Sequence, residues 1–297
     1  MSEHPTDAST APSDSDAGTD VSDSIPDGGD SNAADVLVVG GGVAGLTAAT
    51  FTARAGLDTL VVDADESILA RNAHLENVPG FPAGINSRQF LDLLREQADE
   101  NGVRRRTGRV RDVARDGDRF EVVVAEDGAA VDETASDERT ISAGAVVAAS
   151  WSDVSYLDSL GVETRDAGSK TYVEVDDLGR TNVESVYAAG RLTEKYHQAV
   201  VAAGHGAEVG LTVVHDTETP YYNDWVTPEG YFTDRGREVP PGCEEIDAAE
   251  RDRRDSASRE RMREALSEAH PEPQRTHPSL VDDKLGRLED GPDSVDE

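Results

Sequence analysis

The stretch VVGGGVAGL, residues 38–46, decides the fold of this 297-residue chain. It continues the apolar run VLVV and contains the pattern GxGxxG, with glycines at positions 40, 42 and 45. Between a buried strand and a helix, the first glycine permits a tight turn, the second lets the backbone approach a pyrophosphate, and the third lets the helix pack on the strand. The free N–H groups of the helix N-terminus then face the phosphates. The turn therefore indicates a dinucleotide site, with a purely structural glycine turn as the alternative.

The residues around this turn extend the same pattern. DTLVVD, residues 58–63, reads as a second buried strand that ends at Asp63, where an acid can bind ribose hydroxyls. Further strands are predicted in residues 103–128, with a turn at RDGDR, and in TISAGAVVAAS and SVYAAG. Helices are predicted over 41–56, over 87–102 with Ser87 as the N-cap, and over 197–216.

Two separate blocks of sequence resemble the thioredoxin reductase family of flavoproteins. The first, ARNAHLENVPGFPAG, contains an Asn-x-Pro-Gly-Phe turn that starts at Asn77 and precedes the helix SRQFLDLLREQADENG. The second, VEVDDLGRTNVESVYAAGR followed by HQAVVAAGHGAEVGLTVV, contains an Arg180-Thr181 turn, an Ala-Ala-Gly strand end and a Gln-Ala-Val helix start. The two blocks occur in the family's order and cover about half the chain.

The resemblance implies FAD as the cofactor and a Rossmann-like, three-layer α/β domain. This domain would have a parallel sheet, helices on one side and a small β-meander on the other. By resemblance, Asp63 binds the adenosine ribose, Val110 touches the adenine through its backbone, and Gln198 begins a helix at the N1–C2=O edge of the flavin, where the helix dipole favours the anionic reduced form. The complete set of expected cofactor-binding residues is Gly40, Gly41, Gly42, Val43, Ala44, Gly45, Asp63, Ala64, Arg71, Asn77, Val110, Gly190, Arg191, His197, Gln198, Ala199 and Val200.

Departures from the family restrict the expected chemistry. The family carries a second, NADPH-binding domain with its own glycine turn and a redox CxxC, whereas the interval from Gly108 to Val175 has room only for strands of the FAD domain. Cys243 is the only cysteine, so reduction of thioredoxin through an in-chain dithiol is not expected. Arg191 occupies the place of an aspartate that contacts the flavin ribitol in the family. Arg191 therefore either pairs with a phosphate or weakens FAD binding.

Two functions remain open at this level. The first is an FAD-dependent oxidoreductase that receives electrons from a redox partner protein or from external NAD(P)H, with catalytic residues not assignable. The second is a non-catalytic FAD- or nucleotide-binding module that acts with a partner protein. No metal site is expected, because His197 and His205 lack a third ligand at metal spacing. Ser150 and Ser152 lack a GxSxG elbow, so a hydrolase is not supported.

Composition predicts three segments. Residues 1–34 are rich in Ser, Asp and Gly and read as a disordered acidic tail, and residues 35–215 as the FAD-binding domain. Residues 216–297 read as an irregular aromatic segment followed by a charged helix and tail. The absence of a basic start and of a long apolar run predicts a cytoplasmic protein without a membrane span, and a homo-oligomer is among its expected partners.

Acidic residues number 61 against 28 basic residues, which gives a formal net charge of −33. This balance disfavours nucleic-acid binding, which needs a basic surface. Because the acids are spread along the whole chain, and because Lys170, Lys195 and Lys284 are its only lysines, the composition is typical of a salt-adapted protein. An acidic surface for a basic partner is the alternative.

Removing salt is expected to destabilise the fold. At about 1 M salt the screening length is roughly 3 Å, and like-charge repulsion is largely suppressed. In millimolar salt, repulsion among the excess acids favours the unfolded chain. We expect a loss on the order of 3 kcal/mol in the free energy of unfolding, or about 10 °C in Tm. Thermal unfolding followed by circular dichroism checks this, and a Tm independent of potassium chloride would contradict salt adaptation.

Overall fold

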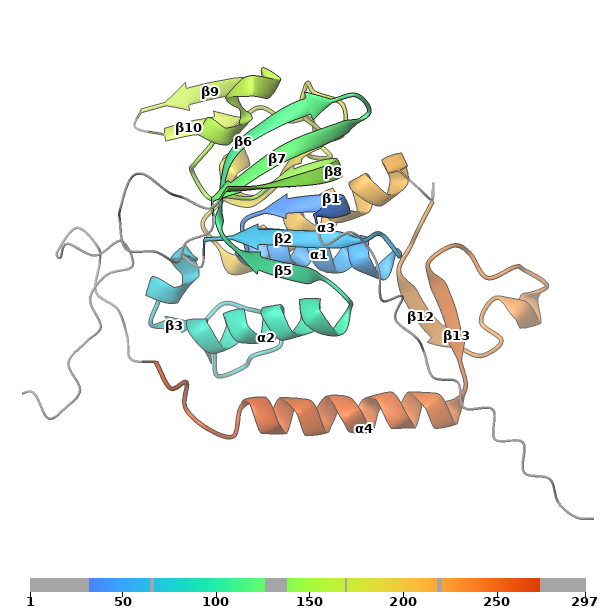
Figure 1. The fold of residues 1–297 in the computed structure, drawn as a ribbon. Coiled ribbons are helices and arrows are strands. Elements are labelled where there is room, and N and C mark those ends of the chain that lie inside the picture. Colours follow the sequence, from blue (N-terminus) through green and yellow to red (C-terminus); the bar gives the residue numbers. More distant parts are fainter. Residues whose placement is uncertain (1–31, 65–66, 126–137, 169, 218–220, 273–297) are drawn as a thin grey trace, which may run out of the picture. The chain divides into compact units, whose positions relative to one another are not determined.

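The computed structural model describes residues 32–64, 67–125, 138–168, 170–217 and 221–272 (Figure 1). The strands are β1 (Ala33–Val39), β2 (Thr59–Asp63), β3 (His74–Leu75), β4 (Ile85–Asn86), β5 (Arg104–Thr107), β6 (Arg109–Asp116), β7 (Arg119–Ala125), β8 (Glu138–Ala148), β9 (Thr164–Ala167), β10 (Lys170–Val173), β11 (Val186–Ala188), β12 (Trp225–Pro228) and β13 (Cys243–Ile246). The helices are α1 (Val43–Arg54), α2 (Ser87–Glu100), α3 (Ala199–Thr217) and α4 (Ala248–Ala265). Short 3₁₀-helices cover Ile68–Arg71, Ser155–Leu160, Gly190–Thr193 and Thr233–Arg235.

The main sheet combines a parallel part with an antiparallel meander. Its order is β5-β2-β1-β8-β7-β6, and β11 also pairs with β8. All pairs among β5, β2, β1, β8 and β11 are parallel, whereas β6, β7 and β8 run antiparallel. The first half of β8 pairs with β7 and its second half with β1 and β11, so one long strand joins both parts. The predicted parallel sheet with a small meander is therefore confirmed.

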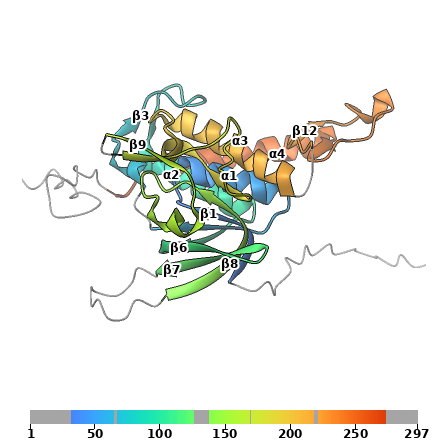
Figure 2. The ribbon, with the colours of Figure 1, turned by 90° about the horizontal axis from the view of Figure 1, so that it is seen from above.

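Two hydrophobic cores lie on opposite faces of the parallel strands, because side chains alternate along a strand. In β1, Val36 and Val38 pack with α1, α2 and α3, whereas Leu37 and Val39 pack with the meander and the 3₁₀-helix at 155–160. Helices thus cover one face and the meander the other (Figure 2). This is the expected three-layer α/β arrangement.

Glycines on α3 let it approach α1 closely. A Cβ at Gly206 would lie 2.3 Å from the carbonyl oxygen of Ala44, and one at Gly210 would lie 2.8 Å from that of Ala48. Any larger residue would force the two helices apart. The small-residue composition of both helices follows from this contact.

Two local expectations need correction. Asn86, not Ser87, caps α2, because its side chain accepts hydrogen bonds from the N–H groups of Arg88 (2.9 Å) and Gln89 (3.4 Å). The Ser87 hydroxyl instead donates to the carbonyl of Asn72. β1 begins at Ala33, inside the segment predicted as tail, whereas residues 1–31 and 273–297 lie outside the described ranges.

Residues after α3 form more regular structure than their composition suggested. β12 and β13 pair in parallel, and α4 begins only at Ala248, because the preceding residues Cys243–Ile246 are in β13. The Tyr222 ring packs into the core beside α1 and α3. Asp224 accepts a bidentate ion pair from Arg54 of α1, with N–O distances of 2.6 to 2.9 Å. The segment is thus attached to the α/β core by both apolar and ionic contacts.

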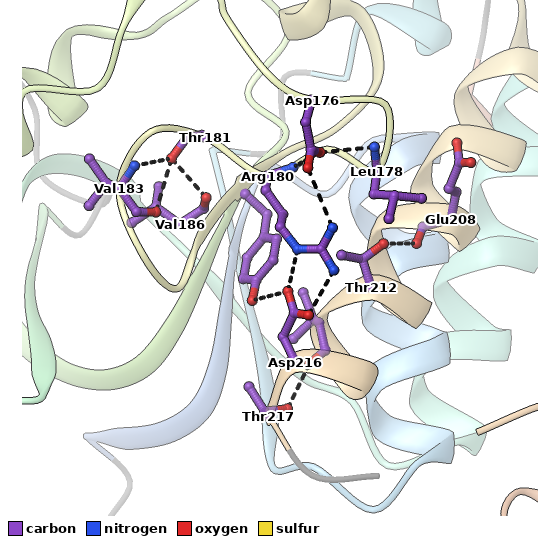
Figure 3. A network of polar contacts seen from close by, with 12 residues as sticks. Asp176, Leu178, Arg180, Thr181, Val183, Val186, Glu208, Thr212, Asp216 and Thr217 are labelled. Carbon is purple, nitrogen blue, oxygen red and sulfur yellow. Dashed lines mark hydrogen bonds and ion pairs between the residues drawn. The ribbon is translucent and has the colours of Figure 1, made fainter. Parts of the chain in front are cut away.

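A polar network ties the turn at 176–181 to the C-terminal end of α3 (Figure 3). The Arg180 guanidinium donates two hydrogen bonds of 2.7 Å to the carboxylate of Asp216. The Tyr187 hydroxyl donates to the same carboxylate at 3.2 Å, and Asp176 accepts from Arg180 at 3.4 Å. The hydrogen bond from Arg180 holds the pKa of Asp216 below its usual range.

Removing the Asp216 charge is expected to destabilise the fold at neutral pH. Because the folded pKa of Asp216 is depressed, its contribution is present above the unfolded pKa of about 3.9 and is lost as pH falls through the folded value. Asp216→Asn should lower the free energy of unfolding by about 1 kcal/mol at pH 7, since the pair is bidentate but partly exposed. Asp177→Asn, an exposed neighbour with the same charge loss, is the control in denaturant titrations. Equal stability of the two variants would contradict a structural role for this network.

Candidate functional site

A cleft of about 940 Å³ opens where the carboxyl ends of β1 and β2 meet the first turns of α1 and α3. Such a position, at the carboxyl ends of parallel strands, is where α/β folds bind ligands. The cleft brings together the two sequence blocks, as the contact between Asn77 and Gln198, 121 residues apart in the sequence, illustrates. The predicted site residues that line it are Gly40, Gly41, Gly42, Val43, Ala44, Asp63, Ala64, Arg71, Asn77, Val110, Arg191, His197, Gln198 and Ala199.

The glycine turn has the geometry that its sequence predicts. Gly40 has φ +109°, a left-handed conformation that favours glycine, and its Cβ would lie 2.5 Å from the Ala149 carbonyl oxygen. A Cβ at Gly41 would lie 2.6 Å from a carboxylate oxygen of Asp63. At Gly42 the nearest such atom is the Ser67 hydroxyl at 3.9 Å, so a side chain there would project into open space. Gly42 lines the cleft, so the missing side chain leaves room for a ligand close to the backbone of the turn.

Gly45, Gly190 and Val200 do not line the cleft. A Cβ at Gly45 would lie 1.9 Å from the Gly40 carbonyl oxygen, so Gly45 permits close packing of α1 on the turn. Gly190 has φ +72°, and its N–H donates to Nδ1 of His205 at 2.9 Å. Both glycines shape the site without facing it. Arg180 and Thr181, from the second sequence block, are also absent from the lining, and Arg180 instead belongs to the network of Figure 3.

The start of α3 forms one end of the cleft. The Asn77 side-chain amide donates to Gln198 Oε1 at 2.6 Å, which joins the turn of the first block to the helix start of the second. The His197 ring packs edge-on against Trp151, with centroids 5.0 Å apart. Burial, and then the charges of Arg191 and Lys170, lower the pKa of His197, so its imidazole is neutral at pH 7.

Several lining residues escaped the sequence reasoning. Trp151 follows β8 directly and has φ +65°, an uncommon conformation for a non-glycine residue. The Tyr156 hydroxyl and the Ser150 hydroxyl are hydrogen-bonded at 2.9 Å beneath it. The only feature of the sequence that could have indicated these residues is that they follow a predicted strand, β8, whose end lies at the cleft. The other missed residues include Ser67, Arg109, Asp153 and Tyr196.

Arg191 is held in a fixed orientation within the lining. Its guanidinium carbon lies 4.6 Å from the centroid of the Tyr172 ring, and its Nη2 donates to the Tyr172 hydroxyl. Its Nε is buried and has no hydrogen-bond partner among the described residues. A buried cationic donor without a partner is costly, so this site favours an anionic or polar ligand.

His205 is a buried support behind the Gly190 turn. It is 5% exposed, and burial, reinforced by the charge of Lys195, lowers its pKa to about 4. Since Nδ1 accepts the hydrogen bond from Gly190, the neutral ring carries its proton on Nε2. His205 therefore fixes the turn through its neutral form. No group of three possible metal ligands occurs among the described residues.

Comparisons with known proteins agree with this geometry. Residues 35–75 match an FAD binding domain, and residues 85–206 match the family described as pyridine nucleotide-disulphide oxidoreductase. The bifunctional thioredoxin reductase/thioredoxin of Mycobacterium leprae is 36% identical over 129 residues, 43% of this chain and 26% of that protein. The thioredoxin reductase of Aquifex aeolicus is 41% identical over 78 residues, 26% of this chain and 24% of that protein. The matched parts thus span about a quarter of these relatives.

Among solved structures, a thioredoxin reductase from Gloeobacter violaceus superposes with a TM-score of 0.53 at 18% sequence identity. The match covers 63% of this chain and 96% of that one, and it supports a common fold. The two family matches and these relatives support a thioredoxin reductase-like, FAD-dependent pyridine nucleotide-disulphide oxidoreductase family, and they indicate FAD as the cofactor. No helix in the described ranges is long and apolar enough to cross a membrane.

Acidification is expected to destabilise the fold through His205. Its folded pKa of about 4 lies below the unfolded value of about 6.5, so only the unfolded chain takes up a proton between these values. This contribution to stability is complete above pH 6.5 and falls by about 1.4 kcal/mol per pH unit down to about pH 4. His205→Gln should be less stable at pH 7 but should show a shallower loss between pH 6.5 and 4.5 in denaturant titrations. An unchanged slope in the variant would contradict this assignment.

Proposed function

We propose that this cleft holds FAD and that the chain is an oxidoreductase whose electrons come from a partner protein or from external NAD(P)H. The observation that carries the proposal is the convergence of residues 40–44 and Asp63 with Arg191 and residues 196–199 in one cleft. Its volume of about 940 Å³ lies within the range of roughly 300–1,000 Å³ that is usual for ligand pockets.

The residues present fit the cofactor. The first turn of α1 contains no acidic residue, and no side chain caps it, so its N–H groups suit a pyrophosphate. Gly42 leaves the space that a phosphate needs, since a Cβ there would enter the cleft. The Asp63 carboxylate, at the end of β2, is suited to accept hydrogen bonds from ribose hydroxyls.

At the other end of the cleft, the chain would hold the reactive part of the cofactor. When bound, FAD supplies the two-electron redox chemistry. Gln198, fixed by Asn77, and Ala199, at the first turn of α3, line this end. The helix start contains no acidic residue, so its dipole stabilises negative charge that develops beside it.

The cysteine content limits the route by which electrons leave the flavin. Cys243 is the only cysteine in the 297-residue sequence, lies in β13 and does not line the cleft. An in-chain dithiol needs two cysteines, so we propose that the reduced flavin passes its electrons directly to another molecule. A non-catalytic flavin-binding module is the second candidate, and the same single cysteine favours it.

Gly42→Ala tests the cofactor site with little effect on the fold. Gly42 has φ −83°, so alanine is sterically allowed, but its methyl group would occupy phosphate space. We expect at least a tenfold loss of FAD affinity, with the Tm of the apoprotein almost unchanged. The measurement is a titration of flavin fluorescence in high salt. Gly204→Ala, where a Cβ meets nothing within 4 Å and which lies outside the lining, is the matched control.

Bound flavin that NADH, NADPH or reduced ferredoxin bleaches in the absorbance spectrum would support the oxidoreductase. Flavin that binds but resists all three donors would favour the module. Equal FAD affinity of Gly42→Ala and Gly204→Ala would contradict this placement of the cofactor.

A further inference from the structure

Cations without acidic partners gather at the α3 end of the cleft. Arg191 and His197 both line this end of the cleft, and the charges of Arg191 and Lys170 lower the pKa of His197. Neither cation makes an ion pair with any described residue, although ten other arginines of the described chain do.

The acids on the neighbouring elements are already engaged. Arg165 of β9 pairs with Glu174 at 2.7 Å and also with Glu194, the acid next to this site on the chain. Asp153 accepts hydrogen bonds from the backbone N–H and hydroxyl of Ser155 at 3.1 and 2.7 Å. Neither Arg191 nor Lys170 forms an ion pair with these carboxylates, which are bonded to Arg165 and Ser155 instead.

The two cations are positioned by the same strand. Lys170 and Tyr172 are two residues apart in β10, so their side chains lie on the same face. Tyr172 is 7% exposed and fixes the Arg191 guanidinium by stacking and by its hydroxyl. The Trp151–His197 pair and the acid-free first turn of α3 complete this end of the cleft.

We propose that the Trp151–His197 end of the cleft is a subsite for an oxyanion, held by Arg191 and Lys170. The oxyanion is the carboxylate or phosphate of a small reactant that exchanges electrons with the flavin. Arg191 contributes a preorganised planar donor, Lys170 a mobile point charge, and neutral His197 one N–H donor. The identity of this ligand as the second reactant rests on the proposed oxidoreductase function.

The chain's two tryptophans provide a direct test. Trp151 lines the subsite, whereas Trp225, in β12, is an internal control in the same spectrum. FAD-loaded protein labelled with ¹⁵N-tryptophan is titrated with inorganic phosphate, and separately with acetate, at constant ionic strength. We expect a saturable shift of the Trp151 indole N–H signal and none of the Trp225 signal. The anion that binds more tightly identifies a phosphate or a carboxylate ligand.

Variants assign the shift to the two cations. Lys170→Gln and Arg191→Gln should each weaken the apparent affinity about fivefold or more, since each removes a charged donor. Lys170→Gln leaves the stacking on Tyr172 intact, so it remains informative if Arg191→Gln perturbs the fold. Arg263→Gln, an exposed charge on α4, should have no effect.

Three results would overturn the subsite: equal shifts of both tryptophans, no effect of Lys170→Gln, or a shift that apoprotein shows and FAD abolishes. The last result would assign the cations to the phosphates of FAD itself. Flavin absorbance is measured on the same samples. Bound flavin without an anion shift contradicts the subsite, whereas the absence of bound flavin contradicts the proposed function. If the protein retains no flavin, the absence of any phosphate shift also overturns the subsite.

Discussion

Close approach of backbones at a few glycines is the constraint on which the site depends. Gly45 lets α1 start directly against the Gly40 turn, and Gly206 lets α3 lie on the carbonyl of Ala44. Because Cβ atoms are missing at these contacts, the first turns of two helices meet above the ends of parallel strands. The positive ends of both helices thereby face one cleft, which suits a ligand with phosphates at one end and a ring that gains electrons at the other.

The polar groups near the site fall into two sets, one that supports the fold behind the cleft and one that lines it. Those behind it are structural: the neutral His205 ring accepts the hydrogen bond of the Gly190 N–H, and Arg180 is held by Asp216. Arg191 faces the cleft, with its ring-stacked guanidinium and unpartnered Nε. The chain as a whole is strongly acidic, so its composition alone does not predict a positive charge in this cleft. Only the structure places the Arg191 charge there.

Much of this could be predicted from the sequence because the relevant signals are local. A buried strand, a glycine turn and a small-residue helix predicted β1, the turn and α1, and β-branched runs predicted the remaining parallel strands. The cap of α2 was misplaced by one residue, because Asn86 and Ser87 are both good cap residues and only the backbone geometry distinguishes them. Trp151 was missed because its role depends on contact with His197, forty-six residues later in the sequence.

The sequence by itself determined the fold class, the dinucleotide-type glycine turn and the lack of a second cysteine, since each follows from residue type and short spacing. Only the tertiary structure decided which predicted residues face the cleft. It removed Gly45, Gly190 and Val200 from the lining and gave Arg191 a partner in Tyr172. The physical reason is that the direction of a side chain, its burial and its ionic partners depend on residues far away in the sequence. These residues come into contact only when the layers of the fold pack together.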